Sequence, residues 1–149
     1  YDGATLGELY SALLAIEPAA VEQLARERSA AVIAELGTLV DELGGTPTAD
    51  PEYAVRSSRL HERITELGGG KALGLFARIA YDLIRARARE IDRAGHAHRD
   101  NNALHLEVLA LVREGQAVEA GARWRAHLEE SASRLGEEAR RAVIDLYGS

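Results

Sequence analysis

The sequence predicts an all-α protein, an antiparallel bundle of about seven helices in one domain. Three observations support this fold class. Apolar residues recur every three or four positions along almost the whole chain, as on the buried face of a helix. No stretch alternates apolar and polar residues as a half-buried strand does. The connections are short, so consecutive helices are expected to run antiparallel around a single core.

The first two helices have clear boundary signals. Thr5 is a suitable N-cap, and Glu8 stands three residues later in the capping-box position. Pro18 cannot donate to the helical ladder, so we expect it to kink or restart the first helix. Ser29 is expected to cap the second helix, which the pair Gly44-Gly45 should end.

The third helix is expected to begin at Asp50-Pro51, a capping residue followed by proline at the first helical position, and to end at the glycine triplet 68–70. The triplet follows no strand and lacks a Gly-Lys-Ser/Thr ending, so we interpret it as a helix terminator and not a phosphate cradle. Further helices are predicted over about 72–92, 101–113, 117–135 and 137–146, with a solvated loop at 94–100 containing His96 and His98.

Composition excludes several function classes. No apolar run approaches the roughly 20 residues needed to cross a bilayer, so no membrane contact is expected. The net charge of −6 argues against this domain binding nucleic acid by itself. The chain contains no cysteine, which excludes disulfides and thiolate metal sites and fits a cytoplasmic location.

Three histidines fall on the inward faces of three predicted helices. His61 lies beside the apolar stripe of the third helix, one turn after Ser57, and His105 and His127 lie among apolar residues of later helices. If they meet, three imidazoles with open positions would suit zinc, nickel or manganese. The alternative from spacing alone is a set of hydrogen-bonded core histidines. Hydrolase chemistry by Ser57 and His61 is disfavoured, because the sequence has no Gly-x-Ser-x-Gly turn.

Three blocks in order resemble the effector-binding domain of FadR-type regulators in the GntR superfamily, the FCD domain. The resemblance covers nearly the whole chain. The blocks are Leu9-Tyr10 through Ile16-Glu17-Pro18-Ala19-Ala20, then Leu60-His61-x-x-Ile64 followed by Gly69, then His105 to Gly115 with Ala117 to Leu128.

The resemblance implies an antiparallel bundle of six to seven helices enclosing a ligand cavity. It further implies a homodimer that senses a small carboxylate or acyl effector, with operator DNA bound through a winged helix-turn-helix domain expected upstream. Many members of the family hold a metal through one aspartate and three histidines. Carried over to this sequence, the histidines are His61, His105 and His127.

The sequence departs from the family pattern at three candidate ligand-binding positions. Ser57 stands where the family has its metal-binding aspartate, Leu13 where an arginine is frequent, and Leu104 where an acidic residue is frequent. Loss of the carboxylate should weaken a divalent site, although three imidazoles still suit zinc. The two leucines predict a more apolar pocket, and hence an acyl or otherwise hydrophobic effector.

The sequence therefore favours a sensor domain without catalysis. One alternative is a small helical metalloenzyme that uses the same three histidines around an activated water. It needs a general base, and the sequence shows no obvious inward-facing Glu or Asp near them. A second alternative is a helical adaptor with a groove for a partner helix, which predicts a solid interior.

Overall fold

Six helices and no strand make up the part of the chain that the computed structural model describes, residues 4–91, 101–134 and 141. The predicted loop at 94–100, with His96 and His98, lies outside these residues, and so does nearly all of the helix predicted over 137–146. The helices are α1 (Leu6–Glu27), α2 (Ala30–Gly44), α3 (Pro51–Gly69), α4 (Lys71–Ile91), α5 (Asn102–Glu114) and α6 (Ala117–Ser133).

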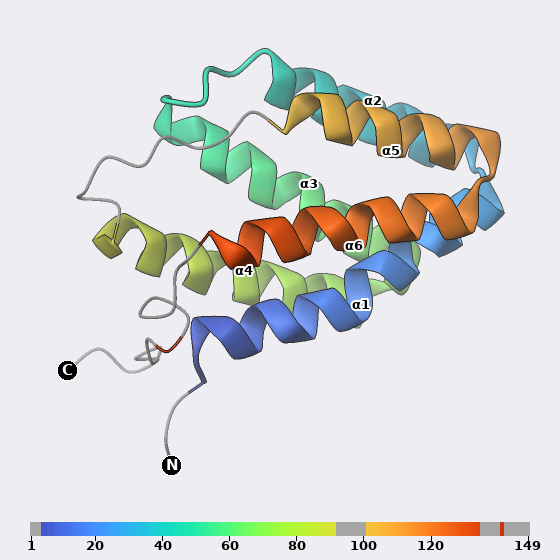
Figure 1. Cartoon of the computed structure of the whole chain (residues 1–149). Coiled ribbons are helices and arrows are strands. Elements are labelled where there is room, and N and C mark those ends of the chain that lie inside the picture. The colour runs from blue at the N-terminus through green and yellow to red at the C-terminus, as the bar shows by residue number, and fades with distance from the viewer. Residues whose placement is uncertain (1–3, 92–100, 135–140, 142–149) are drawn as a thin grey trace.

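Successive helices reverse direction, which confirms the predicted antiparallel all-α bundle (Figure 1). Helices α2 and α5 lie side by side, and α6 lies along α1. Helix α1 packs against α3, α4, α5 and α6, so it is the element that most of the bundle shares. None of the described helices combines the length and apolar character that a bilayer crossing requires.

Most boundaries follow the local signals in the sequence. Thr5 and Glu8 form a reciprocal capping box, in which the Glu8 amide donates to Thr5 Oγ1 at 3.2 Å and the Thr5 amide donates to the Glu8 carboxylate at 2.8 Å. Ser29 and Asp50 cap α2 and α3 as predicted. Pro18 does not restart the first helix, since α1 continues through it to Glu27.

Two apolar clusters fill the interior, and α1 contributes to both. The smaller cluster joins the first half of α1 to α4, and the larger joins the second half of α1 to α2, α3, α5 and α6. The smaller consists of Leu6, Leu9, Leu13, Ala77, Ala80, Tyr81 and Ile84. The boundary between the clusters on α1 falls between Leu13 and Val21, and the polar site described below lies there.

Helices α1 and α3 approach closely at Gly68. A Cβ atom added at Gly68 would lie 2.2 Å from the carbonyl oxygen of Ala20 and 2.9 Å from its Cα, well inside van der Waals contact. Because Gly68 is two turns from His61 and Ala20 is one turn from Glu17, this approach sets the spacing of the two helices at the site.

Candidate metal centre

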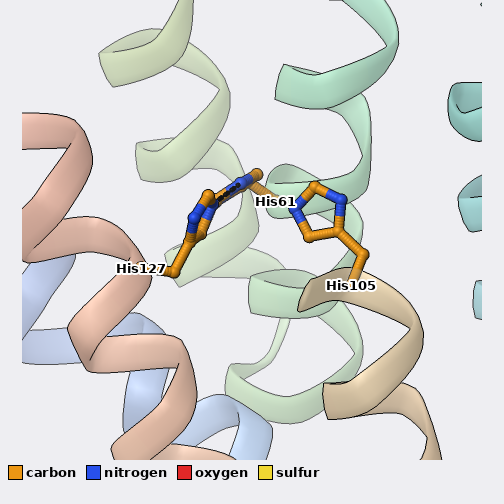
Figure 2. Close-up of side chains that lie close together, drawn as sticks. All are labelled: His61, His105 and His127. Atoms are coloured by element: carbon orange, nitrogen blue, oxygen red, sulfur yellow. Dashed lines mark hydrogen bonds between the residues drawn. The ribbon is translucent and has the colours of Figure 1, made fainter. Parts of the chain in front are cut away.

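His61, His105 and His127 come together from three helices. His61 projects from α3, His105 from α5 and His127 from α6 (Figure 2). Each residue is at most 4% exposed, and one ring nitrogen from each lies within 4.8 Å of the others. The three inward faces predicted from the sequence therefore do converge. Their role as metal ligands stays a prediction.

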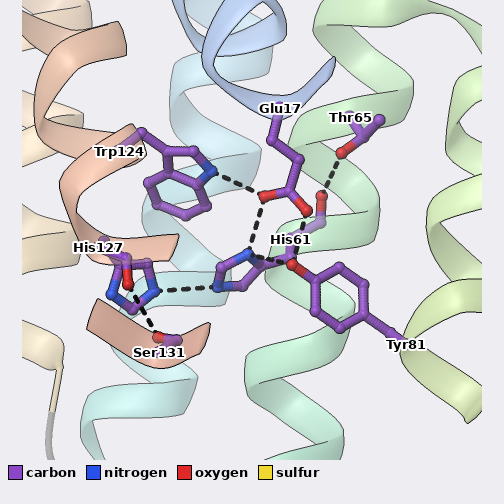
Figure 3. A network of polar contacts seen from close by, with 7 residues as sticks. All are labelled: Glu17, His61, Thr65, Tyr81, Trp124, His127 and Ser131. Atoms are coloured by element: carbon purple, nitrogen blue, oxygen red, sulfur yellow. Dashed lines mark hydrogen bonds and ion pairs between the residues drawn. The ribbon is translucent and has the colours of Figure 1, made fainter. Parts of the chain in front are cut away.

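A buried carboxylate lies behind His61. Glu17 on α1 is fully buried, and its carboxylate is hydrogen-bonded to side chains of three other helices (Figure 3). The Tyr81 hydroxyl donates to Glu17 Oε1 at 2.6 Å, and the Trp124 indole N–H donates to Oε2 at 2.7 Å. His61 Nδ1 lies 2.9 Å from Oε2. Glu17 thus ties α1 to α3, α4 and α6 at one point.

These contacts determine where His61 carries its ring proton. A carboxylate can only accept, so His61 Nδ1 must donate to Glu17. Nδ1 also lies 2.8 Å from the Tyr81 oxygen, whose own proton is directed at Glu17. Burial, and then the charge of Glu17, raise the pKa of Tyr81 well above its usual value, so the phenol keeps that proton. The Nε2 atom of His61 is left facing Nε2 of His127 at 3.3 Å.

His105 has no hydrogen-bond partner at either ring nitrogen among the described residues, although both nitrogens are buried. Leaving a buried polar group unpaired costs about 1–3 kcal/mol. Burial, with a smaller contribution from the neighbouring His61, lowers the pKa of His105 to about 3. Burial likewise lowers the pKa of His127 to about 2, helped by the two other rings. Both rings are therefore neutral at pH 7, the form that binds metals.

The indole of Trp124 packs against all three imidazoles. Its ring centroid lies 4.6 Å from that of His61, 5.4 Å from that of His127 and 5.7 Å from that of His105. Trp124 is 1% exposed and belongs to the larger apolar cluster, so its ring restricts water around the site while its N–H holds Glu17.

Comparison with known families decides the identity of the chain. A model of the FCD domain matches residues 8–130. The chain belongs to the FCD domain family. This is the C-terminal domain of GntR/FadR-type regulators, and it serves as their effector-binding domain. No curated protein and no solved structure matches the chain.

Two residues that surround His61 were not predicted from the sequence, Glu17 and Tyr81. The expectation that no acidic side chain faces inward near the histidines is wrong, because Glu17 is fully buried against His61. The spacing of the apolar residues in the first helix does indicate that Glu17 faces inward. Glu17 is four residues after Leu13 and four before Val21, in register with the buried stripe of α1. Tyr81 is in register with Ala77 and Ile84 in the same way.

The three positions at which the sequence departs from the FCD pattern lie in different parts of the bundle. Ser57 is half-buried on α3, one turn before His61. Leu13 is fully buried in the smaller cluster, whereas Leu104 is half-buried against the larger one. Leu13 and Leu104 thus pack into different apolar clusters, and their contact with an effector stays a prediction.

The ligand cavity expected of an FCD domain is not shown. The space beside His105 measures only about 20 Å³, close to the volume that one water needs. His105 and Trp124 line it together with apolar residues of α1, α2, α3 and α5: Val21, Leu24, Leu36, Val40, Leu60, Ile64, Val108, Leu109 and Val112. An organic effector at this place would have to move these side chains apart.

The donor set nevertheless fits a metal ion. Two nitrogens bonded to a tetrahedral zinc at about 2.0–2.1 Å lie about 3.3–3.4 Å apart. The separation of His61 Nε2 and His127 Nε2, 3.3 Å, matches that edge and is long for a direct N–H···N bond. His105 would supply the third nitrogen, and a metal would satisfy one of the two unpartnered nitrogens of its ring. Ser57 stands where the family has its metal-binding aspartate, so this coordination position would lack a carboxylate ligand.

Proposed function

We propose that this FCD domain is a metal-dependent effector sensor. The metal, zinc with nickel and manganese as the alternatives, would be held by His61, His105 and His127. The observation that carries the proposal is the convergence of three buried imidazoles, one of which has no other partner for its nitrogens. A site of three imidazoles without a carboxylate favours zinc or nickel over manganese, which prefers oxygen ligands. With three protein ligands, a bound metal would have a position open for an effector oxygen.

The effector we propose is a small carboxylate, preferably one with an acyl chain. Its carboxylate would complete the coordination that Ser57 leaves open. Its chain would enter the small space beside His105, whose other lining residues are apolar. Because that space holds about one water, entry requires the surrounding helices to separate. Such a displacement is how occupancy would be transmitted to the rest of a regulator.

The output we propose is a change in operator binding by a homodimer, with DNA contacted through an N-terminal winged helix-turn-helix domain. Membership of the FCD family supports this arrangement. Two large apolar residues one turn apart on α4, Leu75 and Ile79, are 56% and 51% exposed, which gives a face that self-association would bury.

We propose sensing without catalysis. Glu17 is the one buried acid beside the three rings in the described residues, and its carboxylate faces His61 Nδ1, Tyr81 and Trp124. It lies on the far side of the His61 ring from His127, so it is not placed to activate a water on the metal. The nearly solid interior is what the adaptor alternative expected, but the FCD match and the convergent histidines favour a sensor.

The metal site predicts the behaviour of a His105→Ala variant. Wild-type protein purified without chelator is expected to contain about one equivalent of zinc or nickel, and the variant far less than that, because two imidazoles hold a metal poorly. Elemental analysis of both proteins measures this. A His105→Ala protein with undiminished metal content would refute the site, and a folded variant by circular dichroism is the required control.

The proposed effector class predicts a chain-length dependence. With the zinc-loaded protein, octanoate is expected to raise the melting temperature more than acetate does, because only the longer chain buries apolar surface. Thermal unfolding at matched concentrations of the two acids measures the difference. The effect should vanish in His105→Ala, and equal shifts from both acids would count against an acyl effector.

A further inference from the structure

The hydrogen bonds around Glu17 link helices and also fix the orientation of its carboxylate. Of its three hydrogen-bonded partners, only His61 belongs to the proposed metal centre. Tyr81 and Trp124 donate to the same carboxylate and so fix its orientation toward His61. A carboxylate that is fully buried has lost its hydration, and three donors in well-defined directions replace that water.

We propose that Glu17 is the positioning residue of the three-histidine centre, holding the His61 proton on Nδ1 so that Nε2 is presented to the metal, and supplying the negative charge that Ser57 does not. This inference rests on the proposed metal site and deepens it. It assigns a role to an acid that does not touch the metal position and that lies 40 residues before Ser57 in the sequence.

The geometry supports this role. An imidazole that binds a metal through Nε2 has to carry its proton on Nδ1, and an acceptor at Nδ1 selects that tautomer. Glu17 Oε2 is that acceptor, at 2.9 Å. The same hydrogen bond orients the ring, since His61 Nε2 then faces His127 Nε2 at 3.3 Å. A carboxylate acting through the ring also makes Nε2 a stronger donor to a cation.

His61 and His105 differ in whether a hydrogen-bond acceptor selects the tautomer of the ring. Neither nitrogen of His105 has a partner in the described structure, so no acceptor selects its tautomer. Glu17 therefore brings one negative charge to the three-histidine centre, and it does so only through its hydrogen bond to His61. An acidic group would thus lie close to the metal even though Ser57 stands in place of the family aspartate.

The test combines zinc affinity with a direct observation of the proton. In Glu17→Gln, which keeps the size of the side chain and removes its charge, zinc affinity measured by competition with a chromophoric chelator is expected to fall about 10- to 100-fold. Glu22→Gln is the matched control, an acid on the same helix that pairs with Arg26 and lies outside the site. It should change the affinity less than about twofold.

The proton itself is observed by nitrogen-15 NMR of labelled histidine in the wild-type protein, with and without zinc. His61 Nδ1 is expected to be protonated in both states, with its proton resonance far downfield, and to move upfield in Glu17→Gln because an amide oxygen is a weaker acceptor. An unprotonated Nδ1, or equal zinc affinities of Glu17→Gln and wild type, would overturn the inference. The wild-type spectrum stands even if the variant fails to fold.

The two experiments distinguish a wrong metal site from a wrong role for Glu17. If the wild-type protein binds no zinc, the metal site is refuted, whereas the metal-free spectrum still reports whether Glu17 holds the proton. If zinc binds equally to both proteins, the metal site stands and the role of Glu17 does not.

Discussion

Replacing Gly68 by alanine is expected to destabilise the bundle by about 3 kcal/mol, because the new Cβ would lie 2.2 Å from a backbone oxygen. The atom it meets belongs to Ala20, and a helix backbone cannot rotate away as a side chain can. Helices α1 and α3 must separate instead, which loosens both apolar clusters at their shared element. The gain in helix propensity from glycine to alanine, about 1 kcal/mol, offsets only part of this cost.

The matched control is Gly121→Ala on α6. Its Cβ would lie 2.5 Å from Glu22 Cγ, but that side chain is partly exposed and can swing into solvent. The net change in the free energy of unfolding is therefore expected to lie within about 0.5 kcal/mol of zero. Urea unfolding of both variants measures the contrast. Equal stabilities would show that α1 and α3 are not held as closely as described. In Gly68→Ala, zinc affinity should fall as well, since the separation lengthens the Glu17–His61 hydrogen bond.

Replacing His105 by leucine is expected to change stability in opposite directions with and without zinc. In the metal-free protein both ring nitrogens of His105 are buried without partners. Leucine fills a similar volume beside an apolar space and removes that unsatisfied group, so the metal-free variant should be more stable than wild type by about 1–3 kcal/mol. With zinc at about 1,000 times its Kd, the wild type should gain about 4.1 kcal/mol, which exceeds that advantage, and the variant should gain much less.

The melting temperatures of the two proteins should therefore change order on adding zinc. Thermal unfolding in chelator and in excess zinc measures both states. His61→Leu is the matched control. The same substitution there removes a ring that donates to Glu17, and the metal-free protein should lose stability. A His105→Leu protein that is less stable than wild type in chelator would show that His105 contributes to the fold independently of any metal.

Much of the architecture was predictable because its causes are local. The capping box of Thr5 and Glu8, the caps at Ser29 and Asp50, and the helix end at Gly45 depend on residues within four positions of one another. Helical periodicity also placed His61, His105 and His127 on inward faces. At Pro18 the predicted restart is wrong, because α1 continues through this residue to Glu27, while the predicted kink stays a prediction.

The sequence by itself determined the helices, their alternating order, the three inward histidines and the family blocks, because each is written in spacings of a few residues. Only the tertiary structure decided that the rings meet, that Glu17 stands behind His61, and that the space beside His105 holds about one water. The physical reason is that these properties depend on the separation of helices far apart in the chain. Contacts such as Gly68 against Ala20, between residues 48 positions apart, set that separation.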